Sequence, residues 1–182
     1  MTFTSPTASC PSRSLRHTVA AFLLATLAIA AAAAPLAGRV VGVSDGDTVT
    51  VLDATKRTHK IRLLGIDSPE KKQAFGERAK QSLSDLVFNK QVTVEGSKQD
   101  RYGRALGKVM LDGQDINLEQ VRRGMAWHYK QYARDQAPED RQRYAQAEAS
   151  ARAGRVGLWQ EPQPVPPWAF RRAGRDQDGK QP

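Results

Sequence analysis

Apolar and polar residues alternate along several stretches between positions 38 and 111, which is the pattern of half-buried β-strands. These stretches predict five strands, near residues 40–43, 48–52, 60–66, 91–95 and 105–111. The polar run Ser44–Asp47 turns the chain between the first two strands, and the third completes a meander. Pro69 ends the third strand, because proline lacks the N–H that a central ladder needs.

Three other segments repeat their apolar residues at the spacing of a helix. The first begins near Phe75, and the second is capped near Asp115 and ends at a glycine. The third covers about 138–155, with Asp135 or a neighbour as its cap. Three strands, a helix, two strands and two helices is the order of an OB-fold barrel. The sequence therefore predicts an α+β fold, a five-stranded OB-fold β-barrel with three α-helices, over residues 38–160.

The first 34 residues have the pattern of a secretory signal peptide. Arg13 and Arg16 precede an apolar run, Val19–Ala34, whose alanines offer a cleavage site. An uncleaved membrane anchor is the alternative, but this run of ~16 residues is shorter than the about 20 that span a bilayer. We therefore expect residues 1–34 to be removed, the only cysteine with them, and the mature protein to be periplasmic or secreted.

Residues 161–182 are rich in proline, arginine and polar residues. Prolines at this spacing favour an extended, solvated segment, so the sequence predicts a basic C-terminal tail that is partly disordered. Trp168 and Phe170 are the residues of this tail that are apolar enough to pack on the domain.

Basic residues outnumber acidic ones, and they occur throughout the predicted domain. The formal net charge is +9, and removing residues 1–34 takes away two arginines and no acidic residue, which leaves +7. Such a charge attracts polyanions and speeds their encounter with the protein. A generically basic secreted protein is the alternative on charge alone, including one that acts on polyanions of a membrane or cell wall.

Three polar motifs lie near the ends of predicted neighbouring strands. Each has an ordinary structural interpretation: D-G-D-T at 45–48 is a hairpin turn, D-S-P-E at 67–70 is a helix entry, and D-R-Y-G-R at 100–104 is a polar loop. Taken with Arg62 of the preceding strand, however, they offer three candidate carboxylates and two arginines: Asp47, Asp67, Glu70, Arg62 and Arg104. Carboxylates bind a hard divalent cation, and arginine forks hold phosphate oxygens, so the set favours hydrolysis of phosphodiesters.

These motifs give the stretch from 39 to 159 a resemblance to the staphylococcal nuclease family. The shared pattern comprises D-G-D-T, R-L-L-x-x-D-S-P-E, D-x-Y-G-R, a later I-N…V-R-x-G and a closing L-W, in that order. The resemblance implies an OB-fold enzyme that hydrolyses DNA and RNA with one Ca²⁺ ion and leaves 3′-phosphate ends. It also implies roles for individual residues.

In that family's pattern, Asp47 and Asp67 are the carboxylate ligands of the calcium, and Ser68 binds it through the backbone carbonyl. Glu70 orients or deprotonates the attacking water, while Arg62 and Arg104 grip the scissile phosphate. Further positions correspond to substrate-binding residues: Tyr102, Tyr129, Trp127, Lys71 and Lys72.

The chain departs from the family pattern at two places. Trp127 stands where a tyrosine is usual, which keeps base stacking but not a phenolic hydrogen bond. The loop after Glu70 is shorter, and only Lys71 and Lys72 remain of a lysine-rich segment, so we expect altered handling of the substrate. The alternative function is a catalytically inactive nucleic-acid-binding OB-fold module. The retained carboxylates and arginines favour the enzyme, and we expect a monomer without a stable protein partner.

Overall fold

The computed structural model describes residues 1–2, 35–100 and 102–178. The chain separates into two units, residues 1–32 and 33–182, and the second contains the folded domain. The predicted signal peptide lies outside the described residues apart from its first two, and its cleavage stays a prediction. Among the helices described, none is both long and apolar enough to cross a membrane.

Five strands form a closed barrel, as the alternating pattern predicts. The meander consists of β1 (Leu36–Asp45), β2 (Thr48–Asp53) and β3 (Thr58–Leu63), and β1 also pairs with β5 (Gln91–Gln99). The fifth strand, β6 (Ala105–Leu111), runs antiparallel to β5 and parallel to β3. This last pairing closes the barrel and confirms the OB-fold topology.

Three two-residue strands complete the sheets. β7 (Gln114–Asp115) extends β6, while β4 (Ile66–Asp67) pairs with β8 (Trp127–His128) in a separate small sheet. The sequence pattern did not predict these short strands. The β4–β8 pair matters for the predicted site, because it fixes the backbone of Asp67, the second aspartate expected to bind the cation.

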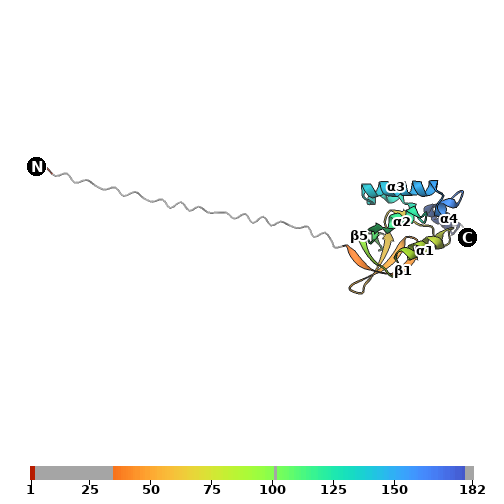
Figure 1. The fold of residues 1–182 in the computed structure, drawn as a ribbon, viewed down its shortest axis with the longest axis horizontal. Coiled ribbons are helices and arrows are strands. Elements are labelled where there is room, and N and C mark those ends of the chain that lie inside the picture. Colours follow the sequence, from red (N-terminus) through yellow and green to blue (C-terminus); the bar gives the residue numbers. More distant parts are fainter. Residues whose placement is uncertain (3–34, 101, 179–182) are drawn as a thin grey trace. The chain divides into compact units, whose positions relative to one another are not determined.

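Helix α1 (Gly76–Val87) covers β1, and α2 (Ile116–Arg122) lies between the barrel and α3 (Pro138–Ala153), as Figure 1 shows. The expected apolar faces are buried, among them Leu83 and Tyr144. Asp115 caps α2 by accepting a hydrogen bond from Leu118 N, as expected. Ala137, rather than Asp135, is the N-cap of α3, because Asp135 ends the short 3₁₀ helix η1 (Lys130–Asp135) that precedes it.

The chain then passes through a second 3₁₀ helix, η2 (Gly157–Gln160), and ends in a fourth helix, α4 (Pro167–Asp178). The expectation of an extended segment is wrong for α4. Pro167 is the first residue of this helix, where its missing N–H costs no hydrogen bond. Trp168 packs from α4 onto an aromatic cluster of the domain.

The fully buried Asn117 ties the end of β3 to β6. Its Oδ1 accepts from Val109 N at 3.0 Å, and its Nδ2 donates to the carbonyls of Gly107 and Leu64, each at 3.0 Å. The core on the other side of these bonds consists of valine, leucine and isoleucine side chains. The barrel therefore holds the ends of β3 and β6, where the predicted site residues lie, in a fixed register.

Candidate active site

The β1–β2 turn brings the first carboxylates to one end of the barrel. Gly46 lies against α1, and a Cβ at this position would be 2.6 Å from the Cβ of Ala79 and 2.8 Å from that of Ser68. The buried amide of Gln120 donates to Gly46 O at 2.9 Å and to Ala79 O at 3.1 Å. Only glycine fits this approach, which points Asp47 toward the start of the next motif.

Arg62 connects Asp47 with Asp67, the two predicted cation ligands. Its guanidinium forms an ion pair with Asp47 and donates to Asp67 Oδ1 at 2.8 Å. Asp47 Oδ2 also accepts from the backbone N–H of Ser68 at 2.7 Å. Both carboxylates are buried, with exposed fractions of 5% for Asp47 and 1% for Asp67. An arginine on a largely apolar strand is costly unless it meets an anion, and here Arg62 meets two.

Burial and charge act in opposite directions on these carboxyls. Burial tends to raise the pKa of Asp47, but the charge of Arg62 and the hydrogen bonds at Asp47 outweigh it, so that the pKa lies below its ordinary value. Burial raises the pKa of Asp67 in spite of its bonds to arginine. Burial, together with the neighbouring Asp47, raises the pKa of Asp45 to about 6. A positive charge close to these three carboxyls is therefore needed for all of them to be ionised at once.

The parallel pairing of β3 with β6 brings the second arginine to the same end of the barrel. In this register Arg62 pairs with Leu106, so Arg104, immediately before β6, lies two residues away from Arg62 along the pair of strands. Asp100 orients Arg104: its carboxylate accepts from Arg104 Nε at 2.7 Å and from Arg104 N at 3.0 Å. The Tyr102 ring is 73% exposed and lies 5.6 Å from the Arg104 guanidinium.

Glu70 stands at the entry to α1 with its side chain 39% exposed. Its backbone N–H donates to the Gln73 side chain at 3.2 Å. The carboxylate is therefore reachable by a water molecule, unlike those of Asp47 and Asp67.

A single cleft of about 880 Å³ collects most of the predicted residues. The predicted site residues that line it are Asp47, Arg62, Asp67, Ser68, Glu70, Tyr102, Arg104 and Tyr129. Asp45 also lines the cleft, although the sequence offered no reason to choose it over Asp47.

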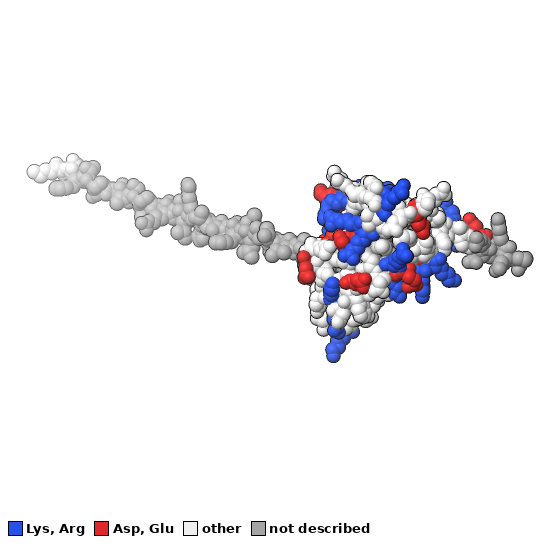
Figure 2. Space-filling model, turned by 45° about the vertical axis from the view of Figure 1, so that its right-hand side comes forward, with Lys and Arg blue, Asp and Glu red and all other residues white. Residues whose placement is uncertain are grey.

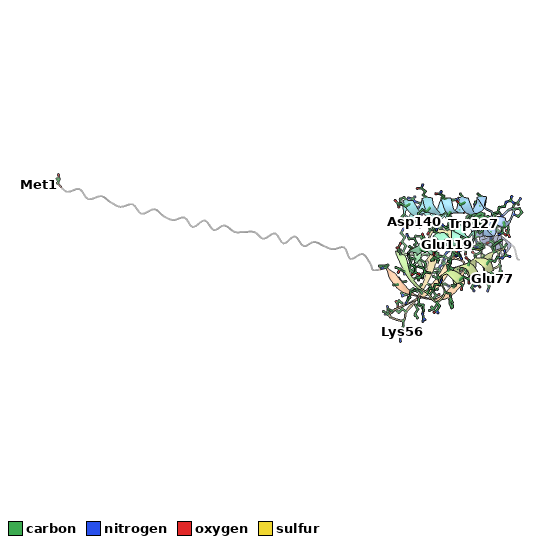
Figure 3. All side chains as sticks on the ribbon, viewed as in Figure 1. Met1, Lys56, Glu77, Glu119, Trp127 and Asp140 are labelled. Atoms are coloured by element: carbon green, nitrogen blue, oxygen red, sulfur yellow. The ribbon has the colours of Figure 1, made fainter. Side chains whose placement is uncertain are left out.

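Three predicted substrate residues lie elsewhere. Lys71 and Lys72 are exposed on the loop after Glu70 and do not line the cleft. Trp127, labelled in Figure 3, is only 7% exposed and packs edge-on against Trp159 at a ring separation of 4.4 Å. The tryptophan that contacts the Tyr129 ring is instead Trp168 of α4, at 5.5 Å and nearly parallel to it.

Arg171 contacts two of the predicted site residues, although the sequence analysis did not identify it. It lies on α4 and donates to Asp67 Oδ2 at 2.7 Å and to Glu70 Oε1 at 2.6 Å. These bonds join residues 101 to 104 positions apart, so no local pattern predicts them. The only local signal is the helical spacing of Trp168, Arg171 and Arg175, which all line the cleft.

On the face of the domain seen in Figure 2, basic side chains are not gathered in one patch. Figure 2 shows Lys and Arg spread over the visible face of the domain, with Asp and Glu among them. Lys56, at the tip of the β2–β3 turn, lies on the opposite side of the domain from α3 (Figure 3). The concentration of arginine at the carboxylates is therefore a property of the cleft.

The donors of the cleft fit a hard cation. The carboxylates of Asp47 and Asp67 and the Ser68 carbonyl are oxygen ligands of the kind that Ca²⁺ prefers. The carboxylates of Asp67 and Glu70 already bind a positive group, the guanidinium of Arg171. The described part of the chain holds no cluster of three or more His, Cys, Asp or Glu side chains arranged for a metal. A site here would thus use two protein carboxylates and leave other positions to water and substrate.

A barrel of this topology that holds carboxylates and arginines in one cleft has the elements of an OB-fold hydrolase of phosphodiesters. A family model described as staphylococcal nuclease homologue matches residues 60–161. The chain belongs to the staphylococcal nuclease family. The nuclease class, a hydrolase of ester bonds, and the OB-fold that the sequence predicts are thereby confirmed.

Several bacterial proteins are similar over most of their length. An uncharacterized endonuclease of Haemophilus influenzae is 47% identical over 134 residues, which are 74% of this chain and 72% of that protein. A micrococcal nuclease of Shigella flexneri is 43% identical over 148 residues, 76% of this chain and 82% of that protein. Protein ParB of Escherichia coli is 44% identical over 163 residues, 84% of this chain and 89% of that protein.

Proposed function

We propose that this nuclease is an exported, calcium-dependent enzyme that cleaves DNA and RNA without strong sequence specificity and leaves 3′-phosphate ends. The observation that carries the proposal is the meeting of Asp47, Asp67 and Glu70 with Arg62 and Arg104 at one cleft. We further propose that it acts as a monomer, outside the cytoplasm and free of the membrane once residues 1–34 have been cleaved.

Asp47, Asp67 and the Ser68 carbonyl would hold the calcium ion. When bound, the ion supplies positive charge to the phosphate oxygens and to the attacking water. The chain's own residues supply the rest. Arg62, held against both aspartates, and Arg104, held by Asp100, present N–H groups to the cleft. Charge grows on the phosphate oxygens in the transition state, so these donors stabilise that state more than the bound substrate.

Glu70 is the base of the reaction. Its exposed carboxylate accepts a proton from a water molecule, whose oxygen forms a bond to phosphorus. The bond from phosphorus to the 5′ oxygen breaks, that oxygen takes a proton from solvent, and the phosphate stays on the 3′ oxygen. Tyr129 is placed to stack on a base and Tyr102 to contact the phosphate side of the nucleotide.

Digestion of plasmid DNA and of RNA by the purified protein tests the proposal, with calcium, with magnesium and with a chelator. We expect calcium to restore best the cleavage that chelation abolishes, because Ca²⁺ accepts oxygen ligands in an irregular geometry, whereas Mg²⁺ demands a nearly ideal octahedron. Full activity in excess chelator would exclude the metal site. No cleavage under any condition, with nucleic acid still bound, would favour the inactive binding module.

Export is tested separately by mass spectrometry of the protein from its native cells. We expect a mature chain that begins between about Ala32 and Ala37, after the alanine run. A membrane-bound protein that still carries Met1 would contradict export by cleavage.

A further inference from the structure

Helix α4 places a guanidinium on Asp67, one of the carboxylates to which the cation is assigned, and on Glu70, the proposed base. Arg171 donates from one nitrogen to Asp67 Oδ2 at 2.7 Å, and from the other to Asp67 Oδ1 at 3.2 Å and Glu70 Oε1 at 2.6 Å. Arg62 takes a further position on Asp67 Oδ1. Both oxygens of Asp67 and one of Glu70 are therefore occupied by arginine nitrogens.

A guanidinium and a calcium ion compete for such oxygens. Each interacts with the lone pairs of a carboxylate, and a calcium ion held by Asp67 would need oxygens that Arg171 now contacts. Burial would lower the pKa of Arg171, but its bonds to Asp67 and Glu70 raise it above the ordinary value, so the side chain is a permanent cation. Arg171 thus supplies the charge that the buried carboxylates need when no metal is bound.

Helix α4 also covers one face of the Tyr129 ring, on which a base is expected to stack. The Trp168 ring lies 5.5 Å from that of Tyr129 with only 13° between their planes. A base stacking on this face of Tyr129 needs the place that Trp168 holds. One helix therefore covers the predicted cation ligands, the catalytic carboxylate and the predicted base platform.

Helix α4 is attached to the domain through its first turns, where Pro167 is buried, Trp168 packs on Trp127 and Arg171 binds the carboxylates. The proline-rich segment before it is joined to the domain by a hydrogen bond from the Gln73 side chain to Val165 O. Arg172, Gly174 and Arg175 are exposed, and an isolated helix of 12 residues is marginal in water. Its position thus depends on the Arg171 and Trp168 contacts.

We propose that α4 is an autoinhibitory segment: Arg171 occupies the cation ligand Asp67 and the base Glu70 while Trp168 covers Tyr129, and calcium with nucleic acid displaces both. This inference rests on the proposed calcium-dependent function. It makes calcium affinity depend on a residue that is not itself a metal ligand. If α4 is seated in about 90% of molecules, removing the competitor raises the apparent affinity roughly tenfold.

Calorimetric titration of the full-length protein with Ca²⁺ alone tests this competition. The variants are Arg171→Ala and the matched control Arg172→Ala, which removes the same charge from the adjacent exposed position. We expect Arg171→Ala to bind calcium about tenfold more tightly, and Arg172→Ala to differ from wild type by less than about twofold. Equal or weaker calcium binding by Arg171→Ala overturns the proposal.

A second variant tests the aromatic contact and does not depend on Arg171. Trp168→Ala removes the stack on Tyr129, so we expect it also to tighten calcium binding. Near-ultraviolet circular dichroism of wild type should change on calcium addition as the stack separates. An unchanged spectrum at saturating calcium, or an unchanged calcium affinity of Trp168→Ala, would contradict the proposal that α4 is autoinhibitory.

The outcomes separate this inference from the proposed function. If wild type needs no calcium for cleavage, the metal assignment fails and the inference fails with it. If wild type needs calcium, but Arg171→Ala lowers the rate at saturating calcium without changing calcium affinity, Arg171 is a phosphate-binding residue. That result refutes autoinhibition and leaves the proposed function intact.

Discussion

Replacing Gln120 with leucine tests how the first aspartates are held in place. Gln120 is fully buried in α2, and no motif identified it. Its amide donates to Gly46 O and Ala79 O, and its Oε1 accepts from the Ser82 hydroxyl at 2.7 Å. The side chain thus joins α2 to both the β1–β2 turn and α1. Leucine has a similar size but offers none of these bonds.

The cost follows from what each partner loses. The Ser82 hydroxyl is only half-buried and can turn to water, and Ala79 O lies within a helix. Gly46 O is buried, and among the described side chains only that of Gln120 donates to it, so leaving this carbonyl unsatisfied costs about 1–3 kcal/mol. With about 1 kcal/mol for the other bonds, Gln120→Leu should lower the free energy of unfolding by about 2–4 kcal/mol.

Urea unfolding followed by circular dichroism measures this change, with Gln114→Leu as the matched control. Gln114 is exposed just before α2, and its replacement should change stability by less than about 0.5 kcal/mol. Because the turn positions Asp47, kcat/KM of Gln120→Leu should also fall about 10- to 100-fold. A loss of stability no greater than that of the control would refute the view that Gln120 fastens the turn.

Three further changes address other parts of the account. Trp127→Ala should cost about 3–5 kcal/mol of stability with an unchanged KM for DNA, because Trp127 is buried outside the cleft; a raised KM in a fully stable variant would return it to the substrate site. With a chelator present, the free energy of unfolding of Arg62→Ala should be lower by about 3–5 kcal/mol, because two buried carboxylates lose their positive partner. A loss below about 1 kcal/mol would show that these ion pairs contribute little to stability. Burial lowers the pKa of His128, so the unfolded chain takes up this proton before the folded protein as the pH falls below about 6.5, and wild type loses stability there. His128→Gln should therefore show a smaller difference in urea midpoint between about pH 7.5 and pH 5.5 than wild type does. An equal difference in the two proteins would contradict this.

The barrel and the core of the site could be predicted because their signals are local and ordered along the chain. Alternation over residues such as Thr48–Leu52 specifies a strand with one buried face, and the positions of D-G-D-T and D-S-P-E at strand ends follow from it. The parallel pairing of β3 with β6 closes the barrel and places Arg62 and Arg104 along one pair of strands that lines the cleft. The site is therefore largely a consequence of topology.

The missed features depend on contacts between distant segments. Prolines before residue 167 favour an extended chain, yet Pro167 begins a helix once Trp168 has an aromatic cluster to pack on. Gln120 has the character of a surface residue in an isolated helix and is buried only because Gly46 and Ala79 offer carbonyls to it. Trp127 was assigned to the substrate by its position in the motif, whereas packing with Trp159 directs its ring to the interior.

The rate of DNA hydrolysis by Glu70→Gln at saturating calcium tests most directly whether this cleft is catalytic. Glutamine keeps the shape of the side chain but cannot take the proton of the attacking water, so kcat should fall about 10²–10³-fold while the protein stays folded. Glu77→Gln makes the same chemical change on the exposed first turn of α1, labelled in Figure 3, and should keep the wild-type rate. A folded Glu70→Gln variant that cleaves DNA as fast as Glu77→Gln would contradict the assignment of the active site.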